Sequence, residues 1–141
     1  MNGLGIQERQ RHGIVIIDVE GEITNGEPSR KLSEALRMLI VESKRRIIIN
    51  LAKVKVIDTS ALDAIIAGGL FVKENKGELK IVNLNSSIAD LTTVRRLHTA
   101  FELYESEDEG IYSFEDDDAR RIRQPLNENF DAERVAKSSI Y

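Results

Sequence analysis

The sequence contains neither cysteine nor tryptophan among its 141 residues. Without cysteine the chain can form no disulfide, no thiolate metal site and no cysteine nucleophile. The lack of tryptophan argues against an aromatic-rich binding surface. No apolar run approaches the roughly 20 residues that a helix needs to cross a bilayer, and the first residues lack the basic and apolar regions of a signal peptide. We therefore expect a cytoplasmic protein without a membrane span.

Motifs for catalysis and for cofactor binding are also missing. Neither GxxxxGK nor GxGxxG occurs, so nothing in the sequence indicates a nucleotide-phosphate site of its own. His12 and His98 stand alone, without metal ligands at the usual spacing. The sequence suggests no Ser–His–Asp constellation and contains no calcium-binding loop. We expect no catalytic residue, no metal and no cofactor, and hence no enzyme.

Negative charge is concentrated near the C-terminal end. The formal net charge is −4, yet residues 102–118 contain nine Asp and Glu and no Lys or Arg. The rest of the chain is therefore net positive. Its Lys and Arg are scattered and are not interleaved with aromatic residues, so we expect no direct contact with nucleic acid. The acidic run itself is most simply a solvated surface.

Strand-like and helix-like patterns alternate along the chain. Apolar runs predict five strands, at residues 4–10, 14–19, 47–51, 79–82 and 101–104. Apolar residues three and four apart predict three helices, at about 28–43, 59–75 and 88–97. The order ββαβαβαβ is typical of an α/β fold with a mixed sheet of about five strands. Right-handed crossovers between parallel strands would place the helices mainly on one face.

Three local features refine this prediction. The run 14–19 is nearly all apolar, which is typical of a strand buried on both faces. Gly68 and Gly69 inside the second helix indicate close packing rather than a functional role. From about Glu105 the pattern weakens, and residues 115–123 could begin another helix. We expect one domain over residues 1–111 and a charged extension over 112–141, either mobile or docked on a partner.

A polar cluster, Asp58-Thr59-Ser60, lies between the third strand and the second helix. Side chains placed there face the helix N-terminus, where free backbone N–H groups and the helix dipole favour an oxygen-rich or anionic group. Two interpretations follow from the residues alone. One of the three side chains is an N-cap, or a hydroxyl, first Ser60 and otherwise Thr59, accepts a phosphate.

At this cluster the sequence resembles a known family. Residues 57–62 (Ile-Asp-Thr-Ser-Ala-Leu) are similar to the Asp-Ser/Thr-Ser-Gly-Leu signature of STAS domains, notably the bacterial anti-sigma-factor antagonists. Residues 20–23 resemble the family's Gly-Glu-Leu/Ile turn, and 76–83 its Gly-Gly-x-Leu-x-Leu-Val-Asn strand. The resemblance extends over roughly residues 5–110. Ala61 stands where the family usually has glycine, and Thr24 where many antagonists have aspartate.

The resemblance implies a partner-switching protein. The unmodified form would bind a serine-kinase anti-sigma factor, which then releases its sigma factor. The kinase would phosphorylate Ser60 and break the complex, and a metal-dependent serine phosphatase would reverse the mark. The residues expected to touch the partner are Asp58, Thr59, Ser60, Ala61, Thr24 and Asn25.

An alternative remains within the same family. The chain could be a non-phosphorylated scaffold subunit, as in a stressosome-like or lipid-transport complex. In that case Ser60 would be only a helix cap. The sequence leaves a homodimer open in both interpretations, and it identifies neither the kinase nor the sigma factor.

Overall fold

The structure, a computed structural model, describes residues 4–115. The chain divides into two compact units, Met1–Gly110 and Ile111–Tyr141, and the sheet and its packed helices belong to the first. In chain order the elements are β1 (Gly5–Arg11), β2 (Ile14–Ile23), α1 (Glu27–Val41), β3 (Arg46–Ile57), α2 (Thr59–Glu74), β4 (Glu78–Val82), α3 (Leu91–Ala100) and β5 (Glu102–Tyr104).

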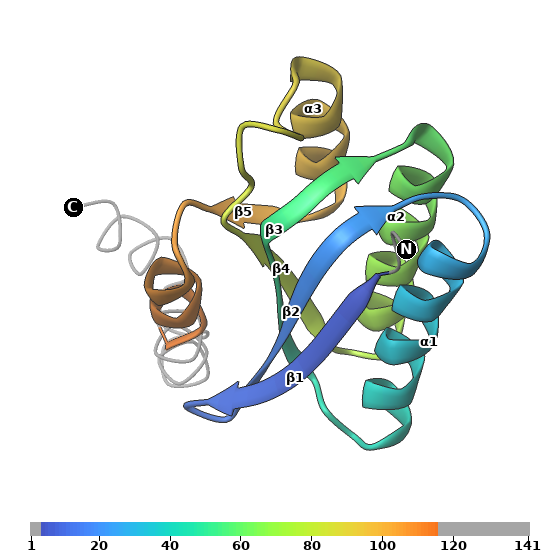
Figure 1. Ribbon diagram of the computed structural model, residues 1–141. Coiled ribbons are helices and arrows are strands. Elements are labelled where there is room, and N and C mark those ends of the chain that lie inside the picture. The colour runs from blue at the N-terminus through green and yellow to red at the C-terminus, as the bar shows by residue number, and fades with distance from the viewer. Residues whose placement is uncertain (1–3, 116–141) are drawn as a thin grey trace. The chain divides into compact units, whose positions relative to one another are not determined.

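The five strands form one mixed sheet in the order β1-β2-β3-β4-β5. β1 pairs antiparallel with β2, and every later pair is parallel. Figure 1 shows α1 and α2 side by side on one face of this sheet. The predicted α/β class, the mixed five-stranded sheet and the order of the elements are confirmed.

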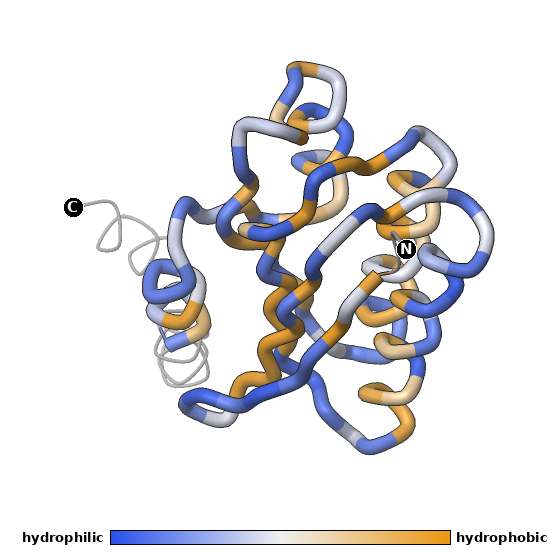
Figure 2. Tube along the Cα trace, in the orientation of Figure 1, coloured by the Kyte–Doolittle hydropathy of each residue, from blue (hydrophilic) through white to orange (hydrophobic). Residues whose placement is uncertain are grey.

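The central strands form the core. All residues of β2 from Ile14 to Ile17 are buried, as are Ile47 to Ile49 of β3, which confirms a strand buried on both faces. Figure 2 shows these apolar segments running through the centre of the sheet, with hydrophilic residues on the outer sides of the helices. β-branched side chains suit this position because they pack well on a pleated surface. No helix in the described part of the chain is long and apolar enough to cross a membrane.

One helix differs from the sequence-based expectation. The chain is helical from residue 107 to the last described residue, 115, whereas the sequence pattern weakens there and suggested a later start. Its beginning packs on the sheet face opposite α1 and α2. A Cβ atom at Gly110 would lie 2.8 Å from Val82 Cγ1 and 3.3 Å from Ile48 Cδ1. Residues 116–123, also considered for this helix, lie outside the described residues, and the predicted boundary at residue 111 stays a prediction.

β2 and β3 extend further than the apolar runs predicted. β2 continues to Ile23 across two shifts in register, at Asp18/Glu20 and at Gly21/Glu22, and Gly21 has φ +111°. Glycine adopts a positive φ more readily than other residues, which explains why a glycine occupies position 21 at the second shift in register. The two parallel strands end together, with Ile23 beside Ile57. The residues that follow each strand therefore meet at one edge of the sheet.

Candidate functional site

Asp58 joins the two chain segments at that edge. It is the N-cap of α2, and its Oδ1 accepts a hydrogen bond of 2.7 Å from the Ala61 backbone N–H. Its Oδ2 accepts a bond of 3.1 Å from the Asn25 backbone N–H, and its own N–H donates to the Ile23 carbonyl at 3.2 Å. One carboxylate thus holds the loop after β2 against the first turn of α2.

Asp58 takes the capping role that the sequence left open among three residues. Thr59 and Ser60 are the first two residues of α2, and both are exposed. Within residues 4–115, neither hydroxyl has a hydrogen-bond partner. Ser60 is therefore not a cap. Its hydroxyl is accessible in the first helical turn, where the dipole favours added negative charge.

The two departures from the family signature have different surroundings. Ala61 is fully buried, so its methyl group packs in the core and is not part of the surface around the Ser60 hydroxyl. Only its backbone could touch a partner. Thr24 is partly exposed, and its carbonyl accepts a 3.1 Å bond from the Ser29 N–H. The structure thus brings Thr24, Asn25, Asp58, Thr59 and Ser60 together at one edge of the sheet.

Replacing Asp58 by alanine is expected to lower the free energy of unfolding by about 2 kcal/mol, because it removes a cap and the bond to the loop. Asp90 offers a matched control. It caps α3 through a 2.9 Å bond from the Thr93 N–H, and its second oxygen accepts a 3.1 Å bond from the Thr93 hydroxyl, three residues on in the same helix. Asp90→Ala should cost less, because it removes a cap alone. Urea denaturation of both variants measures the difference, and equal losses would show that the bond to Asn25 contributes nothing.

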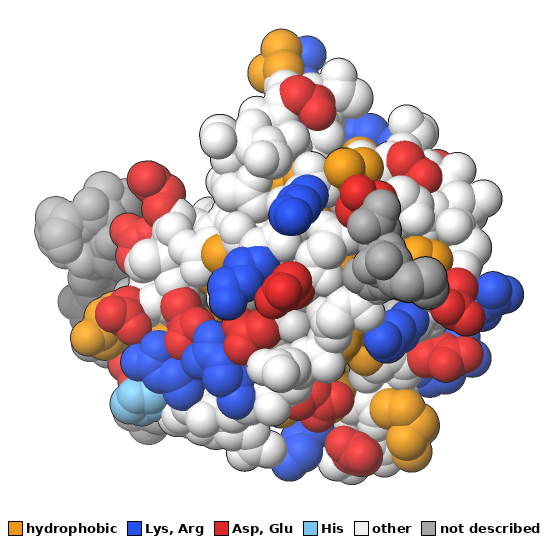
Figure 3. All heavy atoms as spheres, in the orientation of Figure 1, with side chains coloured by type: hydrophobic (Ala, Val, Ile, Leu, Met, Phe, Trp, Pro, Cys, Tyr) orange, Lys and Arg blue, Asp and Glu red, His pale blue; other side chains and the backbone are white. Residues whose placement is uncertain are grey.

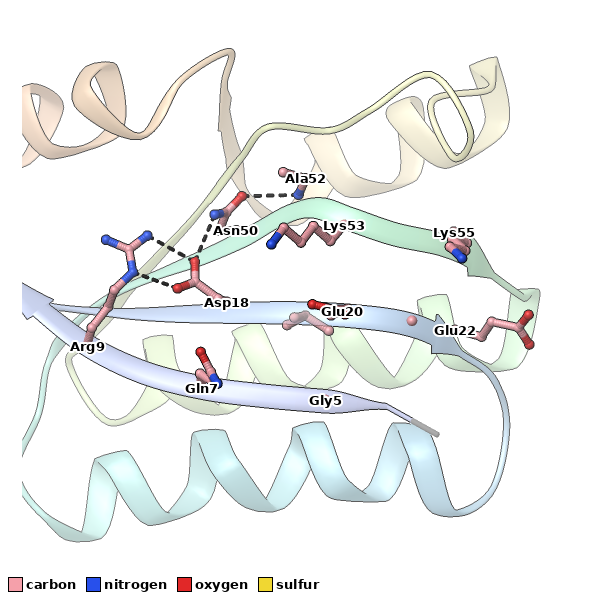
Figure 4. Close-up of a pocket in the computed structure, with 12 residues that line it drawn as sticks. Gly5, Gln7, Arg9, Asp18, Glu20, Glu22, Asn50, Ala52, Lys53 and Lys55 are labelled. Atoms are coloured by element: carbon pink, nitrogen blue, oxygen red, sulfur yellow. Dashed lines mark hydrogen bonds and ion pairs between the residues drawn. The ribbon is translucent and has the colours of Figure 1, made fainter. Parts of the chain in front are cut away.

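A second polar feature lies on the sheet face away from α1 and α2. Arg9 Nε donates to Asp18 Oδ2 at 2.6 Å, and Asn50 Nδ2 donates to Asp18 Oδ1 at 2.8 Å. Asn83 Nδ2 extends this hydrogen-bond network by donating to Asn50 Oδ1 at 3.0 Å. Figure 4 shows the first part of this network at one end of a hollow of about 750 Å³ over β1, β2 and β3. Sequence reasoning missed this network, although Asp18 and Asn50 interrupt apolar runs.

The hollow has no surplus of either charge. Its ionisable lining consists of three basic residues, Arg9, Lys53 and Lys55, and three acidic ones, Asp18, Glu20 and Glu22. Among the described residues there is no cluster of three potential metal ligands. The ionisable lining of the hollow is therefore balanced in charge.

Arg9 and Arg11 also hold the beginning of the helix at residues 107–115. Both guanidinium groups bond the Glu107 carboxylate, and Arg11 bonds Asp108 at 3.2 Å. Figure 3 shows acidic and basic side chains interleaved in this region of the surface. The hydrogen bond from Arg9 lowers the pKa of Asp18 and, together with that from Arg11, the pKa of Glu107. The same contacts raise the pKa of Arg9.

These contacts predict a loss of stability in acid. A carboxyl group whose pKa is lowered by folding stabilises the protein above its unfolded pKa, and this contribution is lost as the pH falls through the folded value. The ordinary values for Asp18 and Glu107 are 3.8 and 4.5. The free energy of unfolding should thus fall from about pH 5 downward, by about 1 kcal/mol after allowance for solvent screening.

In the variant Arg9→Gln the free energy of unfolding should fall less steeply over this pH range. Without the Arg9 guanidinium, the pKa values of the Asp18 and Glu107 carboxyl groups lie closer to their ordinary values. Arg30→Gln is the matched control, since Arg30 is exposed on α1 and has no partner among the described residues. Urea denaturation at a series of pH values measures both slopes. Identical slopes for Arg9→Gln and the unaltered protein would contradict the prediction.

The sequence matches the family model described as "STAS domain" over residues 5–110. This range contains the sheet, the three packed helices and the junction at Asp58. A search of curated proteins finds no significant match.

Several solved structures share the fold. An anti-sigma factor antagonist from Mycobacterium paratuberculosis is 19% identical, with a TM-score of 0.62, and the match covers 79% of this chain and 94% of that one. A putative anti-sigma factor antagonist from Thermotoga maritima is 15% identical with a TM-score of 0.65, covering 77% and 92%. The Bacillus cell fate determinant SpoIIAA in its phosphorylated form is 15% identical with a TM-score of 0.60, covering 78% and 99%. At these identities the likeness shows the fold alone.

Proposed function

Because the chain belongs to the STAS domain family, we propose that it is an anti-sigma-factor antagonist that acts by partner switching, with Ser60 as the switch. One observation carries the proposal: the Ser60 hydroxyl is exposed in the first turn of α2 and takes no part in capping. Structural neighbours described as anti-sigma factor antagonists support it. The chain is then the substrate of its partner rather than an enzyme.

The proposed cycle has two states. In the unmodified state, the first turn of α2 and the loop at Thr24 and Asn25 form a surface that binds a serine-kinase anti-sigma factor, and the sigma factor is released. In the kinase, Ser60 Oγ attacks the γ-phosphorus of ATP, ADP leaves, and the hydroxyl proton passes to a base of the kinase. The phosphate adds a charge of about −1.5 to −2 to this surface. A serine phosphatase hydrolyses the ester and restores the hydroxyl. The proposal places the circuit in the cytoplasm.

The junction supports both states. An acidic group in the first turn of a helix is stabilised by the dipole, so a phosphate on Ser60 need not unfold α2. Asp58 continues to cap the helix because the phosphate is attached to a different residue. Phosphorylation therefore changes the charge of the surface while leaving the fold intact, as partner switching requires.

The test is capture and modification of the full chain. Immobilised unmodified protein should retain a kinase from an extract of its own cells, and incubating the purified pair with ATP should place one phosphate on Ser60. Mass spectrometry of digested peptides locates the phosphate. A phosphate on Thr59 would move the switch by one residue. Protein isolated from cells in several growth states without any phosphate on either residue would overturn the switch and favour the scaffold alternative.

A further inference from the structure

A surface ion pair links α3 to the residue one turn beyond Ser60. The Arg96 guanidinium on α3 bonds the Asp63 carboxylate on α2. Both side chains are partly exposed, at 38% and 59%. Exposed pairs of this kind contribute little to stability and exchange partners at little cost. This pair is therefore free to rearrange when the charge nearby changes.

Ser60 and Asp63 lie three residues apart on α2. Residues at this spacing are neighbours on one helix face, with Cβ atoms about 5–6 Å apart. A phosphate on Ser60 would thus stand beside Asp63, with Asp58 at the start of the same turn. Two carboxylates and a phosphate of charge about −1.5 to −2 would repel one another. A cation already at Asp63 is well placed to reduce this repulsion.

Arginine suits this role. Its planar guanidinium bonds phosphate oxygens in pairs, and bonds between two charged groups are about twice as strong as neutral ones. The neighbouring Arg95 is exposed and has no partner among the described residues. It lies about 100° around α3 from Arg96, as successive helical residues do.

We propose that Arg96 binds the phosphate on Ser60. Its guanidinium group, which bonds Asp63 in the unmodified protein, would then bond both the phosphate and the Asp63 carboxylate. The inference rests on the proposed function, because it takes Ser60 as the phosphate acceptor. Because Arg96 lies on α3, phosphorylation of Ser60 would change the contacts of this helix. The first residue of α3, Leu91, is 66% exposed. Phosphorylation then alters a second element of the surface in addition to α2.

The test uses the full chain with phosphoserine incorporated at position 60 during translation, so no kinase is needed. Titration followed by ³¹P NMR measures the second pKa of the phosphate, about 6 in a free phosphoserine. A nearby cation lowers this pKa because it favours the more charged form. We expect Arg96→Gln to raise the pKa by about half a unit. Arg96→Lys should give an intermediate value, since lysine lacks the paired donors.

Arg95→Gln is the matched control, with the same change in charge on the adjacent residue. It should leave the phosphate pKa close to that of the unaltered chain. Asp63→Asn should lower the pKa, because it removes both a neighbouring negative charge and the competing partner of Arg96. Equal pKa values in the Arg96→Gln variant and the unaltered chain, or equal shifts in the Arg95 and Arg96 variants, would overturn the proposal.

The proposal and the function can fail separately. If Ser60 is never phosphorylated in cells, the switch fails while the titration still reports whether Arg96 binds a phosphate there. If the kinase modifies Ser60 but the titration shows no effect of Arg96, the switch stands and the link to α3 is wrong. Circular dichroism of each variant checks that the fold is retained.

Discussion

Replacing Ser60 by aspartate is expected to weaken binding to the captured kinase by at least about 100-fold, which corresponds to ~2.7 kcal/mol. Thr59 and Ser60 in the first turn of α2 are exposed in the free chain and would lose water in the complex. An added negative charge there must be desolvated and lies on the same turn as the Asp58 carboxylate. Unfavourable charge contacts across an interface cost several kcal/mol. Isothermal titration calorimetry with the purified kinase measures the loss.

Ser60→Ala should bind within about threefold of the unaltered chain, because the lost hydroxyl has no hydrogen-bond partner in the described structure. Ser86→Asp is the control for charge alone, since Ser86 is exposed in the loop after β4. Thr59→Asp tests the fallback residue. If Ser60→Asp binds like the unaltered chain, the proposed switch is wrong.

Stability separates a true loss of binding from unfolding. An acidic side chain in the first turn of a helix contributes about 0.3–1 kcal/mol through the dipole. Ser60→Asp should therefore unfold at the same or a higher urea concentration than the unaltered chain. Weaker binding by a protein that is no less stable can only come from the changed surface. A variant that loses both would instead indicate that Ser60 has a structural role.

The order of the elements could be predicted because buried strands and amphipathic helices repeat with different periods. The ends of the strands could not be predicted as well. β3 continues from Leu51 to Ile57 with Val54 buried and Lys53 and Lys55 exposed. Its buried residues Leu51 and Val54 are three positions apart, because the register with β2 shifts twice along this part. The sequence there lacks the period of two that indicates a strand.

The helix that begins at residue 107 could not be predicted from its own composition. Its acidic residues suggested a solvated run, whereas Glu107 and Asp108 pair with Arg9 and Arg11, almost 100 positions earlier in the chain. A short stretch of sequence does not reveal which basic residues, far away in the chain, will pair with its acidic side chains. Acidic residues also suit a helix N-terminus, and this signal could have indicated a start at residue 107.

The candidate site was predicted in part. The polar cluster and its place before a helix were visible in the sequence, because polar residues between an apolar run and a helical pattern are typical of a cap. Which residue caps the helix depends on the backbone, since only Asp58 has extended dihedral angles, φ −86° and ψ 172°. The bond to Asn25 depends on two strands ending together, which periodicity alone does not determine.

Replacing Gly69 by alanine is expected to lower the free energy of unfolding by about 2 kcal/mol, even though alanine favours helices by ~1 kcal/mol over glycine. A Cβ atom at this position of α2 would lie 1.9 Å from Phe101 Cε1 and 2.4 Å from Cζ. Phe101 is buried directly after α3. The Phe101 ring would have to move, and this movement would disturb the packing of α3 and β5 against α2.

The neighbouring glycine provides the control. A Cβ atom at Gly68 would meet only Leu36 Cδ1, at 2.8 Å, which is the end of a flexible side chain. Gly68→Ala should thus be neutral or stabilising, and urea denaturation of both variants compares them. Adding Phe101→Leu to Gly69→Ala should cost less than the sum of the two single changes, because a smaller side chain makes room for the methyl group. Simple additivity would show that Phe101 is not what excludes a side chain at residue 69, and the close packing of α2 would need another explanation.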